Sequence, residues 1–125
     1  MEVSIHDPCP VRNTPAVHRA VRELLGKMNI KVVETEKRGE NSICCGDSLY
    51  PHHSMEEIRS AMKRRADSMP CSRVVVYCVS CIKAMHIGGK TPCYLADLLL
   101  GKPTAPKECD IKKWHDALEA YIKQH

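Results

Sequence analysis

Short β-branched runs alternate along the chain with longer segments whose apolar residues recur at helical spacing. The runs rich in Val, Ile and Thr predict strands over residues 2–6, 30–35 and 73–77, with a shorter strand near 91–93. Segments with an apolar stripe and a capping or breaking residue predict helices, over residues 15–26, 55–69, 78–85, 94–100 and 110–124. Because strands and helical crossovers alternate, the pattern predicts an α/β fold: a small parallel sheet of three to four strands with helices on both faces.

Two segments differ from this alternation. Residues 36–53 show no periodicity, and a compact domain seldom keeps so long a segment unless it carries function. The last predicted helix begins behind the capping residue Asp110, and four apolar side chains share one of its faces: Ile111, Trp114, Leu118 and Ile122. We therefore expect residues 1–125 to form a single domain with the C-terminal helix, residues 110–124, packed on it.

The composition is that of an ordinary globular protein built without phenylalanine: 43% of the residues are hydrophobic and 27% are charged. The chain opens with no basic segment followed by an apolar one, and no run approaches the roughly 18 apolar residues of a membrane span. We therefore expect a cytoplasmic protein with no membrane span. The net charge is +4, and Lys and Arg are scattered among Asp and Glu, so nucleic-acid binding is not indicated.

Eight cysteines are the unusual feature of this composition. A disulfide framework would need an oxidising compartment, which nothing in the sequence indicates, so reduced thiols or metal thiolates are expected. Five of the cysteines follow predicted strands: Cys9, Cys44, Cys45, Cys78 and Cys81. Because loops at the carboxyl ends of parallel strands gather at one edge of a sheet, we expect these five sulfurs to converge there.

The spacing of these cysteines suits a metal centre. Cys78 and Cys81 have the two-residue spacing that lets both sulfurs reach one ion, and the predicted helix start favours the thiolate form. Neighbouring residues of an extended strand point apart, so Cys44 and Cys45 require a turn, which Gly46 makes accessible. Tetrahedral zinc needs only four ligands, whereas five soft sulfurs favour iron with bridging sulfide. Zinc held by four of the five, and a metal-free dithiol, remain as alternatives.

Several motifs occur in a fixed order along most of the chain. His6 to Cys9 reads HDPC, CCG stands at Cys44 to Gly46, and C-x-x-C stands at Cys78 to Cys81. The gaps are 34 residues between Cys9 and Cys44 and 32 residues between Cys45 and Cys78. Arg12 follows the first motif, and YLADLLLG occupies residues 94–101. This combination resembles the cysteine-rich CCG domain of heterodisulfide reductase catalytic subunits and of iron–sulfur subunits in glycolate, lactate and glycerol-3-phosphate oxidising complexes.

The resemblance implies a Rossmann-like α/β domain whose five motif cysteines bind an iron–sulfur cluster, in some members a non-cubane [4Fe-4S] centre that reduces disulfides. It also implies a redox domain for electron transfer, working with ferredoxin-like or flavin-containing subunits. Some copies of the domain hold zinc instead, which would suit a structural or docking role. The chain departs from the family pattern in three ways. Residues 47–50 replace a glycine-rich run, Val79 stands where proline is common, and only one copy of the motif is present.

Other candidate residues have expected structural roles. Three cysteines match no motif and are expected to be packing or surface thiols: Cys71, Cys93 and Cys109. His6 is expected to partner the Asp-Pro turn, with donation of a hydrogen bond or proton to a cluster thiolate as the alternative. His52 and His53 are expected to be surface residues, with a proton relay as the alternative.

Overall fold

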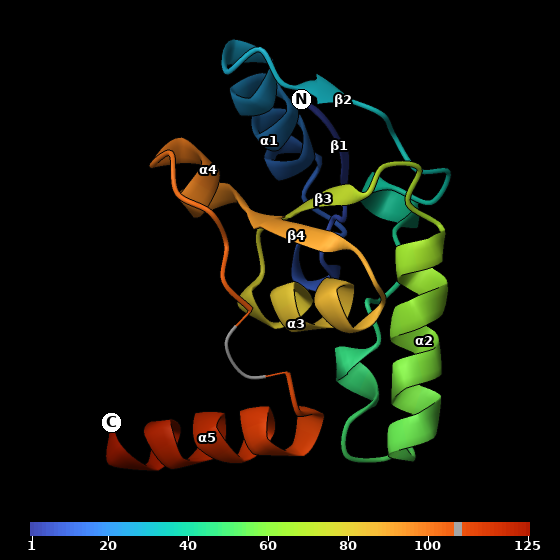
Figure 1. Ribbon diagram of the computed structural model, residues 1–125, viewed down its shortest axis with the longest axis vertical. Helices are drawn as coiled ribbons and strands as arrows, with labels where there is room; N and C mark the ends of the chain where they lie inside the picture. The colour runs from blue at the N-terminus through green and yellow to red at the C-terminus, as the bar shows by residue number, and fades with distance from the viewer. Residues whose placement is uncertain (107–108) are drawn as a thin grey trace.

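The computed structural model describes residues 1–106 and 109–125 and confirms the predicted α/β architecture (Figure 1). Four parallel strands form one sheet in the order β2-β1-β3-β4: β1 (Glu2–Ile5), β2 (Lys31–Val32), β3 (Arg73–Val76) and β4 (Thr91–Tyr94). The described α-helices are α1 (Pro15–Lys27), α2 (Met55–Asp67), α3 (Val79–Ile87), α4 (Leu95–Leu99) and α5 (Ile111–Gln124). Three short 3-10 turns complete the described elements: η1 (Cys9–Val11), η2 (Gly39–Asn41) and η3 (Asp47–Leu49). None of the described helices combines the length and apolarity that a bilayer crossing would require.

Helices cover both faces of the sheet. Both faces are apolar, because successive valines of β3 point to opposite sides of the sheet. Val75 packs with β1, α1 and α4 on one face of the sheet. Val74 and Val76 pack on the other face, against α2 and α3. Each face therefore has its own apolar core, and the sheet separates the two.

The second strand is shorter than the predicted strand 30–35. Only Lys31 and Val32 pair with β1 as β2, although the Val33 amide still donates a hydrogen bond to the Val3 carbonyl at 2.8 Å. The chain then leaves the sheet, because the Glu34 carboxylate binds Arg22 and the Thr35 hydroxyl donates to the Ser68 carbonyl. Side-chain partners, rather than strand pairing, therefore direct residues 34–35.

The two central strands lie side by side, but the chain leaves them toward opposite faces. Ser4 and Ile5 of β1 pair with Val74 and Val75 of β3. The helix that follows β1 is α1, on one face, whereas the helix that follows β3 is α3, on the other (Figure 1). At such a switch point the outgoing loops diverge beyond the carboxyl ends of the strands, and ligand sites of open α/β sheets form there.

The C-terminal helix contacts the rest of the described chain through its first turns. Ile111 is fully buried in the core shared with α2 and α3, and the His115 ring stacks on Tyr50 with centroids 4.0 Å apart. Farther along α5 the large apolar side chains are exposed: Leu118 by 42%, Tyr121 by 60% and Ile122 by 63%. The organisation of residues 1–125 as one domain with this helix packed on it stays a prediction.

We predict that Ile111→Ala lowers the free energy of unfolding by about 2–4 kcal/mol, because it leaves a cavity in a closed core. The matched change Ile122→Ala, at an exposed position of the same helix, should alter it by less than about 0.5 kcal/mol. Urea unfolding of both variants at one fixed metal content measures this difference. Equal effects at the two positions would mean that α5 does not pack in the way described.

Candidate metal centre

The five motif cysteines line a single cavity at the carboxyl edge of the sheet. This cavity has a volume of about 210 Å³, and its lining includes Cys9, Cys44, Cys45, Cys78 and Cys81 together with His6, Asp47 and two prolines. The predicted convergence of sulfurs from three separate segments is therefore present in the structure. The residues that line it include neither the remaining cysteines, Cys71, Cys93 and Cys109, nor His52 and His53.

Cys9 is positioned by the turn that follows β1. Pro8 is extended, and Cys9 begins the 3-10 turn η1, closed by the bond from the Arg12 amide to the Cys9 carbonyl at 3.1 Å. The Arg12 side chain also folds back toward Cys9, and its Nη2 atom lies 3.5 Å from Cys9 Sγ. Burial and the neighbouring Cys44 nevertheless raise the pKa of Cys9, and the positive charge of Arg12 only partly opposes that shift.

The vicinal pair Cys44 and Cys45 sits in the turn that Gly46 was expected to allow. Gly46 has φ +109° and ψ −18°, a conformation that L side chains rarely adopt. Its amide donates to Cys44 Sγ at 3.3 Å, and the Ser48 hydroxyl lies 2.9 Å from the same sulfur. Cys44 therefore stays half-buried in the turn while Cys45 points into the core.

The second cysteine pair is fixed by the start of α3. Cys78 is the N-cap residue of this helix, and the Cys81 amide donates to the Cys78 carbonyl at 3.0 Å. Both sulfurs thus lie at a helix N-terminus, where the helix dipole favours negative charge. The Ser80 hydroxyl lies 3.3 Å from Cys78 Sγ and adds a second polar contact.

The buried sulfurs of Cys45 and Cys81 lie close together in the cavity. Their residues are 5% and 3% exposed, and the two Sγ atoms lie 3.6 Å apart. Two sulfurs bound at about 2.3 Å to one tetrahedral ion would lie about 3.8 Å apart, so this separation fits a shared metal. With His6, whose ligand atom lies within 4.8 Å of both sulfurs, they form a group that could hold a metal ion.

Within each cysteine pair, one thiol has a lowered pKa and the other a raised pKa. Donation from the Cys45 thiol, supported by Ser48 and Gly46, lowers the pKa of Cys44 to about 4. Donation from the Cys81 thiol likewise lowers the pKa of Cys78 to about 5. The donating thiols have raised pKa values, because each loses its proton next to another sulfur. The buried pair therefore needs a cation to become thiolate, and metal binding would release those protons.

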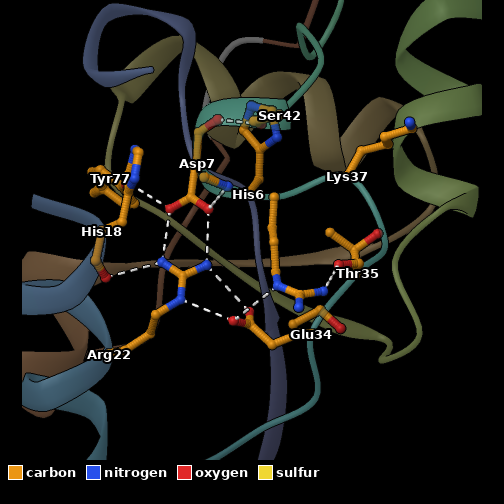
Figure 2. Close-up of polar contacts among 12 residues, drawn as sticks. His6, Asp7, His18, Arg22, Glu34, Thr35, Lys37, Ser42 and Tyr77 are labelled. Atoms are coloured by element: carbon orange, nitrogen blue, oxygen red, sulfur yellow. Dashed lines mark hydrogen bonds and ion pairs between the residues drawn. The ribbon is translucent and has the colours of Figure 1, made fainter. Parts of the chain in front are cut away.

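Asp7 holds the segments that carry these cysteines together (Figure 2). Its carboxylate accepts two hydrogen bonds from Arg22, at 2.9 and 2.8 Å, and one each from the Gly39 amide at 2.8 Å and the Tyr77 hydroxyl at 2.6 Å. Asp7 precedes Cys9, Gly39 lies in the segment that leads to Cys44, and Tyr77 precedes Cys78. Burial alone would raise the pKa of Asp7, but the bonds from Arg22, Tyr77 and Gly39 outweigh it and hold this pKa at about 2.

A second buried group, Arg65 of α2, joins the same segments from the other side. Its residue is 1% exposed, and its guanidinium donates to His6 Nδ1 at 3.0 Å, the Lys37 carbonyl at 2.9 Å and Ser42 Oγ at 3.1 Å. Within residues 1–106 and 109–125, no carboxylate forms an ion pair with it. Burial lowers the pKa of Arg65, whereas Asp7 and the nearby cysteine sulfurs oppose that shift. A buried cation therefore lies beside the candidate centre and favours negative charge there.

A third polar group joins the start of α5 to the cavity wall. Asp47, which lines the cavity, accepts a hydrogen bond from the buried Lys83 ammonium, and His115 Nε2 lies 3.1 Å from the same carboxylate oxygen. The Lys83 nitrogen also lies 3.8 Å from the centre of the Trp114 ring. The first turns of α5 thus contact the wall of the candidate site.

Sequence reasoning did not single out Asp7, Arg65 or Lys83. For Arg65 a signal was present, since it lies three residues after Met62 and seven after Ile58 and thus shares their apolar stripe on α2. A charged residue on the buried face of a helix indicates an internal partner. The partners of Asp7 lie 15, 32 and 70 positions away in the chain, so sequence spacing alone gave no indication of them.

Comparison with known proteins gives one family match. The family described as CCG, cysteine-rich domain, matches residues 3–86. That range begins in β1, ends in α3 and contains all five cysteines of the cavity, whereas β4, α4 and α5 lie outside it. No curated protein and no solved structure matches the chain.

We predict that Gly46→Ala destabilises the folded chain and weakens metal binding. A Cβ at this position would lie 3.0 Å from both the backbone nitrogen and Cγ of Met62, and the positive φ adds strain of about 1–3 kcal/mol. Gly26→Ala is the matched control, because nothing lies within 4 Å of its added Cβ and alanine favours the helix. Urea unfolding and zinc titration of both variants check this; a Gly46→Ala chain that behaves like the Gly26→Ala chain would contradict it.

We also predict a pH-dependent effect of Asp7→Asn in the reduced, metal-free chain. The depressed pKa of Asp7 means that its carboxylate stabilises the fold above about pH 4, the range of an unfolded Asp, and that this contribution is lost as pH falls toward 2. At pH 7 the variant should lose about 3 kcal/mol of unfolding free energy, because Arg22 loses its buried partner. The loss should shrink as the pH falls through that range.

The control for this measurement is Asp67→Asn, which removes a carboxylate paired with Lys63 on the surface. Its effect at pH 7 should stay below about 1 kcal/mol. An Asp7→Asn effect of that size, or one independent of pH, would show that the Asp7 ion pair does not secure the fold.

Proposed function

The chain belongs to the CCG family of cysteine-rich domains, and on that basis we propose that it is a redox domain that binds an iron–sulfur cluster. The proposed ligands are Cys9, Cys44, Cys45, Cys78 and Cys81. The observation that carries the proposal is the single cavity that all five line, although they come from three segments of the chain. Thiolates are the usual protein ligands of iron–sulfur clusters.

The charges around the cavity support an anionic centre. Arg12 lies beside Cys9, and the buried Arg65 has no carboxylate ion pair among the described residues. Several thiolates around a cluster would supply the negative charge that such a buried cation requires. With neutral thiols, this guanidinium would keep the charge of Asp7 nearby but would lose that of the cysteine sulfurs.

The size of the cavity favours a cluster over a single ion. Its volume of about 210 Å³ is several times the roughly 30 Å³ that one water molecule occupies in the liquid, so it has room for several atoms. Five sulfurs also exceed the four ligands of a structural zinc site. The number of ligands and the available space therefore agree.

When bound, the cluster would supply one-electron transfer. The chain's own residues would hold it: the five thiolates as ligands, and Arg12 and Arg65 as nearby positive charges. We propose that the domain works within a larger oxidoreductase, with ferredoxin-like or flavin-containing subunits that exchange electrons with it. Reduction of disulfides at the cluster, and a [4Fe-4S] composition, are the finer form of this proposal.

The second candidate is a zinc-binding structural or docking domain. The observation that favours it is the 3.6 Å separation of Cys45 and Cys81, which suits two ligands of one tetrahedral ion. Zinc would use four of the five sulfurs, for instance those of Cys44 and Cys78 in addition to the buried pair. Colour separates the two candidates, because zinc has a filled d shell and leaves a protein colourless.

The test is anaerobic purification followed by iron, acid-labile sulfide and zinc analysis. We predict iron and sulfide in comparable amounts in the wild-type chain. Cys→Ser changes at each of the five proposed ligands should lower the iron content, because serine is a poorer ligand for this soft-metal centre. Cys71→Ser and Cys93→Ser are the matched controls and should retain it, since neither residue lines the cavity.

Stoichiometric zinc without sulfide in the wild-type chain would decide for the zinc-binding domain. A chain with neither metal that reduces disulfides in a Cys78-dependent manner would instead indicate a metal-free dithiol. Retention of full iron and sulfide in all five variants would remove these cysteines as ligands.

A further inference from the structure

His6 occupies an unusual position at the inner wall of the cysteine cavity. The residue is 1% exposed and lines the cavity, and one of its ring nitrogens lies within 4.8 Å of the Cys45 and Cys81 sulfurs. Its Nε2 atom is buried and has no hydrogen-bond partner within the part of the chain that the structure describes. Buried polar atoms are almost always paired, so this one indicates a partner that the protein itself does not provide.

The hydrogen bond from Arg65 determines which nitrogen of His6 carries the proton. Arg65 Nε is always a donor, and it lies 3.0 Å from His6 Nδ1, so Nδ1 must be the acceptor. A neutral imidazole has one N–H group, which is therefore at Nε2. A second proton at Nδ1 would displace this hydrogen bond and place two positive charges side by side in the protein interior.

This tautomer decides between two roles at the cavity. A metal ligand needs a lone pair at Nε2, and the other ring nitrogen then carries the proton. Here Arg65 requires Nδ1 to be the acceptor, so Nε2 offers a proton rather than a lone pair. Metal-bound thiolates and bridging sulfides are suitable acceptors for such a group, and hydrogen bonds to sulfur help to set the potentials of iron–sulfur clusters.

We infer that His6 is not a metal ligand but a positioning residue, whose Nε2–H donates a hydrogen bond to a sulfur of the centre bound in this cavity. Arg65 fixes the donating tautomer. The inference deepens the proposed function, on which it rests for the presence of a bound centre. It assigns the unpaired Nε2 atom an acceptor, which is the thiolate of Cys45 or Cys81 or a sulfide held beside them.

The first test is long-range ¹H–¹⁵N NMR of the histidine rings in the reduced metal-free chain and in the zinc-loaded chain. We expect His6 to show the Nε2–H tautomer in both, with an Nε2–H resonance that shifts when zinc binds and its acceptor becomes a zinc thiolate. His18 is an internal control, because its Nε2 is also buried and unpartnered among the described residues but does not line the cavity. The Nδ1–H tautomer with zinc on Nε2 would overturn the inference.

The second test compares His6→Leu with His6→Gln, whose amide keeps an N–H donor near the position of Nε2. His6→Leu should bind zinc about 10- to 100-fold more weakly and should lower the midpoint potential of the iron-loaded centre. His6→Gln should recover much of both properties, and His18→Leu should change neither. A wild-type potential and zinc affinity in His6→Leu would contradict the inference.

The outcomes separate this inference from the proposed function. A chain that binds zinc with His6 in the Nε2–H tautomer, but no iron or sulfide, supports the role of His6 and removes the iron–sulfur proposal. A chain that binds an iron–sulfur cluster while His6 Nε2 coordinates metal supports the proposed function and removes the role of His6.

Discussion

The buried carboxylate of Asp7 links the segments that carry the cysteines. The Asp7 carboxylate bonds at once to α1, to the segment before the vicinal cysteines and to the residue after β3, through Arg22, Gly39 and Tyr77. Its own backbone carbonyl adds the Ser42 hydroxyl at 2.6 Å. These bonds compensate the burial of the carboxylate, which explains why a charged group can occupy the centre of the molecule. These bonds link the three segments that form the walls of the cavity.

The sequence predicted the fold and the meeting of the cysteines for physical reasons that act locally. Period-two and helical patterns report which face of an element is buried, and parallel strands bring their outgoing loops to one edge without further information. A turn at Gly46 was predicted because two adjacent sulfurs must face the same way, and the positive φ of Gly46 confirms this turn. Patterning did not reveal the early end of β2, because Glu34 and Thr35 leave the sheet for partners that lie elsewhere in the chain.

Polar groups inside the molecule were the part that the sequence did not reveal. Arg65 lies on the apolar stripe of α2, and its hydrogen bonds reach residues 28 and 59 positions away. Lys83 is buried on α3 beside Asp47, although nothing in its neighbourhood along the chain distinguishes it from a surface lysine. Such groups are tolerated only where the tertiary structure supplies matching partners, so their roles follow from packing rather than from spacing. The same holds for His6, whose ring is oriented by Arg65 rather than by the Asp-Pro turn beside it.

The uneven burial of the five sulfurs has a kinetic consequence. Of the five sulfur-bearing residues that line the cavity, Cys45 and Cys81 are buried, whereas Cys9, Cys44 and Cys78 are half-buried and lie closer to solvent. Any cofactor must pass the outer sulfurs before it reaches the inner pair, and it must leave by the same route. In the proposed centre the outer sulfurs would therefore be the first ligands to meet an incoming metal, and their bonds to it would be the first that a chelator or oxidant in solution could attack.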